Sequence, residues 1–134
     1  MSDVLRFTIN RGLVILRHQQ PFLDWLMSAD PNPPEHLTLA GLEEDGESFL
    51  IPGEPTIGNE DEAVKWVEKR WAMLFEHVLS EWLTDEELWP KNRTLKMFRQ
   101  WFTVEYRSMV WDLTNEPLEI EEWCDAAGPG EVIH

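Results

Sequence analysis

The sequence predicts an α+β fold in which a small antiparallel sheet of three to four strands is packed by one long helix and two or three shorter helices. Extended segments rich in β-branched and apolar residues gather toward the two ends of the chain, and the middle shows helical periodicity. The regular strand–helix alternation of a doubly wound parallel sheet is absent. The length of 134 residues fits one domain, so we expect residues 1–134 to fold as a single α+β domain.

Four segments are expected to be extended. Residues 4–9 (VLRFTI) and 12–17 (GLVILR) open the chain, and the turn-forming residues 10–12 between them predict either a hairpin or one bent strand. Residues 48–52 (SFLIP) predict a short strand between a glycine and a proline. Residues 104–113 (VEYRSMVWDL) predict the last long strand, because valine, tyrosine and tryptophan favour strands.

Several short helices are expected around these strands. A first helix begins at Pro21, which needs no amide hydrogen in a first turn, and ends before the Asp30-Pro31 pair. Residues 37–45 predict one helical turn, and residues 53–60 predict a loop. Thr84 is expected to cap a second short helix through Glu87, and residues 94–102 are expected to be helical.

The strongest element is a continuous helix over residues 60–83. Asn59 is a good N-cap, and Glu62 lies where the acid of a capping box belongs. At 1.5 Å per residue this helix would be about 36 Å long. Its apolar residues follow the three-and-four spacing of one helix face, namely Val64, Val67, Trp71, Leu74, Phe75, Val78 and Trp82.

The charge of the chain is strongly acidic and unevenly distributed. Eleven Lys and Arg stand against 26 Asp and Glu, which gives a net charge of −15. Neither Lys nor Arg occurs between Arg17 and Lys65 or after Arg107. Such a surface disfavours direct nucleic-acid binding and anionic membranes and permits a basic protein partner. Solubility alone is the alternative explanation.

The remaining global features predict a cytoplasmic location. Cys124 is the single cysteine, so no internal disulfide can form, and its acidic neighbours predict low reactivity. The first residues lack the apolar core of a secretory signal, and no apolar run is long enough for a membrane span. The acidic segment 115–134 is expected to be partly mobile, with its start held to the body by Leu118, Ile120 and Trp123.

Three segments resemble a family of small bacterial proteins of unknown function. They read INRGLVILRHQQPFLDWL, LWPKNRTLKMFRQWF and SMVWDL, and the similarity extends from about Ile9 to Leu113. Gly12 departs from the family pattern, which has a small polar residue there. The resemblance implies a bacterial, cytoplasmic, single-domain protein, and it brings no activity, cofactor or catalytic residue with it.

His77 and Glu81 are the best candidates for chemistry. They lie four residues apart on the predicted long helix, which places them on one face, as a metal site or a proton-transfer pair requires. A metal needs a third and a fourth ligand, and the sequence has no HExxH motif or second histidine pair. We therefore predict no metal site, no cofactor and no catalytic residue; the alternative is a solvated or ion-paired histidine.

A basic cluster follows Trp89. Basic residues gathered on one side of a short helix, with tryptophans on either side, favour binding of an anion or of a partner's acidic group. The alternative is pairing with the protein's own carboxylates, which outnumber its cations. The cluster consists of Lys91, Arg93, Lys96 and Arg99.

Two tryptophans are candidates for exposed anchors at an interface, where tryptophan is enriched. Trp66 lies off the apolar stripe of its helix, and Trp89 precedes a proline in a connection. Burial is the alternative for both. The other tryptophans considered, Trp25, Trp71, Trp82, Trp101 and Trp111, mostly fall on stripes that face a core.

These features predict a non-catalytic interaction or regulatory module of the bacterial cytoplasm. Its acidic surface would meet a basic protein partner or its own copy. The alternative is a small enzyme or ligand-binding domain with a site near Arg93, His77 and Glu81, which a deep pocket holding two or more of them would reveal. A third interpretation is nucleic-acid mimicry by the acidic face.

Overall fold

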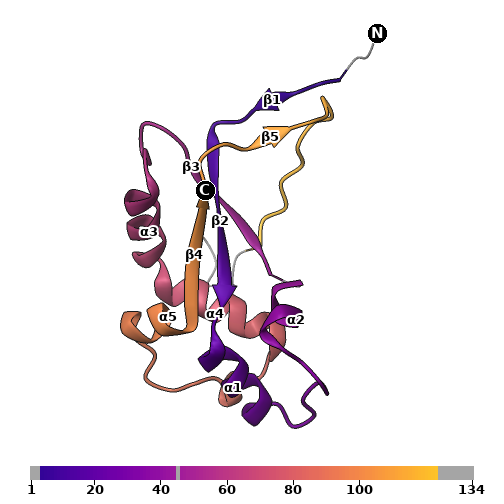
Figure 1. Cartoon of the computed structure of the whole chain (residues 1–134), viewed down its shortest axis with the longest axis vertical. Helices are drawn as coiled ribbons and strands as arrows, with labels where there is room; N and C mark the ends of the chain where they lie inside the picture. The colour runs from indigo at the N-terminus through magenta and orange to yellow at the C-terminus, as the bar shows by residue number, and fades with distance from the viewer. Residues whose placement is uncertain (1–3, 45, 124–134) are drawn as a thin grey trace.

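The computed structural model describes residues 4–44 and 46–123, and its architecture is α+β as predicted (Figure 1). The part of the predicted mobile tail from Cys124 onward lies outside the described residues. Two sheets are present in the described part of the chain, one of three strands and one of two. The helices there are α1 (Gln20–Ala29), α2 (Leu39–Glu44), α3 (Glu60–Glu68), α4 (Trp71–Trp82), α5 (Leu95–Trp101) and the 3-10 turn η1 (Glu86–Leu88).

The larger sheet is antiparallel with the order β3-β2-β4. Its strands are β2 (Arg11–His18), β3 (Ser48–Pro52) and β4 (Phe102–Arg107), and Val14 lies between Phe49 and Tyr106 across the ladder. The side chains of β2 alternate, because residues 12, 14, 16 and 18 are buried while residues 13, 15 and 17 are only half-buried. The helices therefore cover one face of the sheet, as expected.

The smaller sheet decides between the two alternatives for residues 4–17 and corrects the prediction of one long strand over residues 104–113. The chain does not form a hairpin at residues 10–12; β1 (Phe7–Thr8) instead pairs antiparallel with β5 (Trp111–Asp112). The alternative of a bent strand is the one observed, since β2 starts at Arg11. The predicted long strand 104–113 is likewise divided into β4 and β5. Both bends fall at the same level, where the Ile9 amide donates to the Val110 carbonyl at 3.2 Å.

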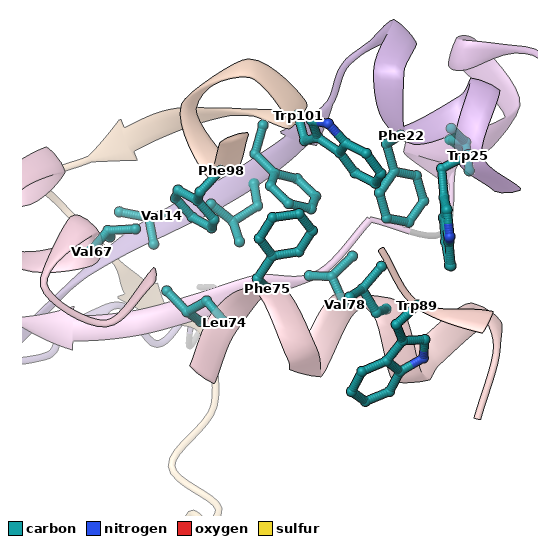
Figure 2. Close-up of a cluster of buried hydrophobic side chains, with 14 of the residues drawn as sticks. Val14, Phe22, Trp25, Val67, Leu74, Phe75, Val78, Trp89, Phe98 and Trp101 are labelled. Carbon is teal, nitrogen blue, oxygen red and sulfur yellow. The ribbon is translucent and has the colours of Figure 1, made fainter. Parts of the chain in front are cut away.

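Aromatic side chains form the centre of the core, where large apolar areas are removed from water (Figure 2). Phe75 of α4 packs against Trp101 and Phe102, with ring centroids 5.3 and 5.4 Å away. Phe22 of α1 contacts the same two residues from the other side, at 6.0 and 5.6 Å. The junction of α5 and β4 is thus held by helices from both halves of the sequence.

The prediction of one helix over residues 60–83 is wrong. α3 ends at Glu68 and α4 begins at Trp71, with Arg70 at φ −112° and ψ 21° between them. α3 lies beside β4, whereas α4 runs across the end of the sheet (Figure 1). Both halves keep their apolar residues inward, because Val67, Leu74, Phe75 and Val78 are all buried.

Local contacts of Arg70 with the preceding turn accompany the break, and neither glycine nor proline occurs there. The Arg70 guanidinium donates to the Trp66 carbonyl at 3.0 Å and lies 3.5 Å above the Trp66 ring. The Arg70 amide bonds to Val67 as in a 3-10 turn, at 2.9 Å. The apolar spacing of the two helices is compatible with a single helix, so periodicity does not reveal the turn.

Three smaller predictions are also corrected. Asp85, rather than Thr84, caps the short helix, because its side chain accepts from the Glu87 amide at 3.0 Å. Trp111 does not face a core. The tail residues expected to hold segment 115–123 to the body, Leu118, Ile120 and Trp123, are exposed.

No helix within the described residues is both long enough and apolar enough to cross a membrane.

Candidate functional site

Glu47, His77 and Glu81 form a compact cluster of side chains that can bind a metal ion. His77 Nε2 lies 2.7 Å from a carboxylate oxygen of Glu47 and 3.8 Å from one of Glu81. One potential ligand atom from each residue lies within 4.8 Å of those of the other two. The structure thus brings together His77 and Glu81, as their spacing predicts, and adds Glu47 from a distant part of the sequence.

Each member of this cluster is positioned by a regular element. His77 and Glu81 are one turn apart on α4, and Glu47 immediately precedes β3. The ring of Phe49, two residues along in β3, packs edge-on against the His77 ring with centroids 5.6 Å apart. The three side chains are partly open to water, with exposed fractions of 39% for Glu47 and His77 and 49% for Glu81.

A small cavity lies beside the cluster and contains a buried histidine in its wall. Its volume is about 10 Å³, and Glu47, Glu81 and His18 are among its lining residues. His18 is only 4% exposed, and its Nδ1 has no hydrogen-bond partner among the described residues. Buried polar atoms are normally hydrogen-bonded, so this nitrogen calls for an explanation.

The surroundings of His18 favour its neutral form. Burial lowers the pKa of His18 below 6.5, and the negative charge of Glu43 opposes this shift. The ring is enclosed by aromatic side chains, with Phe22 at 4.6 Å, Phe102 at 6.0 Å and Trp82 at 6.5 Å between centroids. A neutral imidazole has one nitrogen that accepts a hydrogen bond or a metal.

Arg93 does not join His77 and Glu81. Its guanidinium donates to a carboxylate oxygen of Glu76 at 2.8 Å and to the Pro90 carbonyl at 2.9 Å. Glu76 is the sequence neighbour of His77 but faces another direction on α4, toward Arg93. The cavity that Glu47 and Glu81 line does not include Arg93.

The basic cluster is divided between internal ion pairs and exposed lysines. Arg99 makes a two-point pair with Glu68 of α3, both bonds being 2.9 Å, and this contact lowers the pKa of Glu68. Lys91 and Lys96 are exposed and make no ion pair with any described residue. The two arginines of the cluster therefore pair with the protein's own carboxylates, which is the alternative to binding an external anion.

Neither candidate tryptophan is a freely exposed anchor. Trp89 is a core residue, and its indole N–H donates to the Leu83 carbonyl at 2.7 Å. Trp66 is half-buried beneath Arg70. It lines an open hollow of about 500 Å³ together with Arg11, Gly53 and Glu54, among others. Burial, the alternative for both residues, holds fully for Trp89 and partly for Trp66.

The face of the larger sheet opposite the aromatic core carries a charged network that reaches helix α2. Arg17 donates to Glu43 of α2, and to Glu105 of β4 at 2.9 Å. Arg107 also donates to Glu105, at 3.1 Å. These cations lower the pKa of Glu105. The network satisfies its own charges, so it offers no free cation to a ligand.

A surface that the sequence did not point to is the apolar arm, which we define as residues 4–8 and 109–123 with the β1–β5 ribbon at its base. The ribbon projects beyond the end of the larger sheet (Figure 1). Most of the exposed large apolar side chains found among the described residues belong to this arm. They are Val4, Leu5, Phe7, Met109, Trp111, Leu113, Leu118, Ile120 and Trp123.

Sequence reasoning missed Glu47, His18 and the arm for different reasons. Glu47 reaches His77 from 30 positions away, and nothing local distinguishes it from the other acids. His18 occupies the same alternate positions of β2 as the buried residues 12, 14 and 16, and this pattern does predict its burial. The sequence pattern of the arm predicts strands and a tail held to the body, because apolar residues in extended segments normally face a core.

No family model matches the sequence, and no curated protein or solved structure matches it, so the geometry described above is the basis for assigning a function.

Proposed function

We propose that the protein is a non-catalytic interaction module of the bacterial cytoplasm that binds a basic protein through its apolar arm. The observation that carries the proposal is the concentration of exposed apolar side chains on the arm. Trp111 is 55% exposed, Ile120 90% and Trp123 86%. Exposed apolar side chains that gather on one part of a protein usually mark a binding site.

The ribbon at the base of the arm supports this interpretation. β1 and β5 have two residues each, and they pair with one another antiparallel. A ribbon of two short strands is marginally stable in water without a further packing partner. The register pairs Phe7 with Asp112 and Trp111 with Thr8, so the two aromatic rings lie on opposite faces of the ribbon. A partner groove that encloses both faces would bury both rings and stabilise the ribbon at the same time.

The charge of the arm favours a basic partner over a second copy. Asp112, Glu116, Glu119, Glu121 and Glu122 alternate with its apolar residues, and Arg6 is the one basic residue in its sequence. An apolar groove lined by Lys and Arg complements this pattern. A second copy would bring a net charge of −15 against another −15, which disfavours association.

The small-enzyme alternative has less support. The cavity beside Glu47 and Glu81 has a volume of only about 10 Å³, and Arg93 lies in a different contact. The open hollow beside Trp66 is large, but its described lining lacks a histidine, a cysteine or a pair of carboxylates. A substrate site would need both space and converging reactive groups.

The experiment compares two matched exposed residues. Trp111 is replaced by a photo-crosslinking amino acid in one sample and Met73 of α4, which is 56% exposed, in another. Cross-linking in a bacterial lysate should recover one basic protein at position 111 and not at position 73. We then expect the purified pair to bind, and the double variant Phe7→Ser, Trp111→Ser to bind at least about 30-fold more weakly, as loss of a hot spot does.

The control variant Met73→Ser should leave that affinity unchanged. Three results would overturn the proposal: no cross-linked protein at position 111, equal affinity for the double variant and the native chain, or a cross-link to a second copy. The last result, with a dimer mass by light scattering, would identify the protein's own copy as the occupant. Circular dichroism of the double variant confirms that its fold is retained.

A further inference from the structure

We propose that Glu47, His77 and Glu81 bind a divalent transition-metal ion, with Zn²⁺ as the preferred ion. The ion would connect the segment before β3 to helix α4. This inference is independent of the apolar arm, because the cluster lies on other elements. It departs from the sequence-based prediction of no metal site, because Glu47 supplies the third ligand that the sequence did not reveal beside His77 and Glu81.

The distances within the cluster are close to those of a bound ion. Zinc bonds of about 2.1 Å in a tetrahedron place neighbouring ligand atoms about 3.4 Å apart. His77 Nε2 lies 2.7 Å from Glu47 and 3.8 Å from Glu81, and the largest separation within the set is at most 4.8 Å. Shifts of about 1 Å, taken up by the flexible glutamate side chains, would complete the geometry.

The types of ligand select the class of ion. Magnesium and calcium prefer six or more oxygen ligands, which two carboxylates alone do not provide. An imidazole nitrogen with two carboxylates suits the first-row transition ions, and zinc accepts this mixture at four-coordination. Three protein ligands leave one position for water.

His18 provides the second, independent observation. It is nearly fully buried, its Nδ1 lacks a partner among the described residues, and it lines the cavity that Glu47 and Glu81 also line. A cavity of about 10 Å³ has room for a single water molecule. A water on the metal, placed in this cavity, would donate a hydrogen bond to the neutral His18 ring and satisfy it.

The site would act as a tether within the fold. Glu47 precedes β3, an edge strand of the larger sheet, and the other two ligands lie on α4. The ion would replace the His77–Glu47 hydrogen bond and would also bring the two glutamate side chains together without charge repulsion. Binding to the folded state alone raises its stability by mass action. We therefore expect zinc to stabilise the protein.

The test is a zinc titration of the full chain, followed by isothermal calorimetry and thermal unfolding. Glu47→Gln, His77→Asn and Glu81→Gln each remove one ligand, and each should weaken zinc binding at least about 100-fold, because even the supporting residues of metal sites commonly contribute 10- to 100-fold. Asp61→Asn, at an exposed acid of α3, is the control with the same charge change as the glutamate variants and should bind zinc like the native chain.

His18→Phe should weaken zinc binding about 10-fold, because the metal-bound water loses its acceptor. One equivalent of zinc should raise the Tm of the native and Asp61→Asn proteins, and chelation should reverse the effect. Equal affinity in the three ligand variants and the control would show diffuse binding to an acidic surface and overturn the site. An unchanged affinity in His18→Phe would overturn the role of the water.

Discussion

At the scale of single residues, His18 shows how a polar side chain can be placed in an aromatic core. Its position on β2 alternates with residues that point away from the helices, so its burial follows from the register of the strand. Three aromatic rings surround it, and Nδ1 has no partner among the described residues. A charged imidazole would lose its hydration there, which is why burial lowers the pKa of His18.

This shift predicts a pH dependence of stability in metal-free protein. The unfolded chain binds a proton at His18 near pH 6.5, whereas the folded protein binds it only at lower pH. The unfolded state therefore takes up more protons as the pH falls below about 6.5, and the free energy of unfolding decreases. The contribution is fully present above that pH. Urea unfolding between pH 7.5 and 5, with a chelator present, measures the decrease.

The matched variant for this prediction is His18→Phe, which keeps an aromatic ring among Phe22 and Phe102. It should lose the part of the pH dependence that His18 causes, while the acids near that ring, Glu43, Glu47 and Glu81, remain. A pH profile identical to that of the native chain would contradict the assignment. His77→Asn serves as the control, because it removes a partly exposed histidine from the same region.

Glu47 marks the limit of what single residues reveal in a sequence. The i, i+4 spacing of His77 and Glu81 predicts that they share a helix face, and the structure places them 3.8 Å apart. The third member comes from the segment before β3, and its approach depends on how β3 packs against α4. Nothing in the local sequence specifies that packing, so two members of the candidate metal site could be predicted and the third could not.

At the scale of elements, the sequence predicts where helix α3 begins better than it predicts where that helix ends. Asn59 caps α3 as expected, accepting from the Glu62 amide at 2.9 Å, while the Glu62 carboxylate accepts from the Gly58 amide at 2.7 Å. These bonds are local and therefore visible in the sequence. The turn after Glu68 depends on the different surfaces that α3 and α4 cover, which a periodic apolar stripe does not encode.

The cap gives a prediction for a single element. Asn59→Ala leaves the Glu62 amide without its acceptor at the start of α3, so it should lower the free energy of unfolding by about 1 kcal/mol, within a range of about 0.5–2. Asn59→Asp supplies an equivalent acceptor and should retain most of the stability. Urea unfolding of the three proteins measures the difference. Equal losses in the alanine and aspartate variants would show that the side-chain bond contributes nothing.

For the strands too, the sequence predicts the local conformation but not the pairing between distant segments. The composition of residues 4–17 and 104–113 correctly indicates extended structure, but strand pairing depends on the bend that β1–β2 and β4–β5 share. Gly12 lies at that bend, where a Cβ atom would come within 3.2 Å of the Tyr106 ring. The close approach of the two strands there is a tertiary feature, and the local turn pattern leaves a hairpin and one bent strand as equal alternatives.

At the scale of the whole molecule, the fold class follows from the sequence because it needs only the types of elements and their order. Strands grouped toward the ends of the chain and helices in its middle are enough to indicate an antiparallel sheet packed by helices. The apolar arm could not be predicted in the same way, because apolar residues that face solvent have the same composition as those that face a core. Exposure is a property of the complete structure, which is why the candidate binding surface emerged only there.

The net charge makes a last prediction about the complete chain. At −15 the molecule repels itself in the compact state, and the ion pairs that oppose this repulsion, such as Arg17–Glu105 and Arg99–Glu68, lie in partly exposed positions. Salt shortens the range of the repulsion to about 10 Å at 0.1 M, while it weakens exposed pairs that contribute little.

Raising NaCl from about 0.01 to 0.3 M at pH 7.5 should therefore raise the Tm. The rise should be much smaller near pH 4.5, the isoelectric point, where little net charge remains to be screened. A Tm that falls with salt at pH 7.5 would mean that the ion pairs outweigh the repulsion.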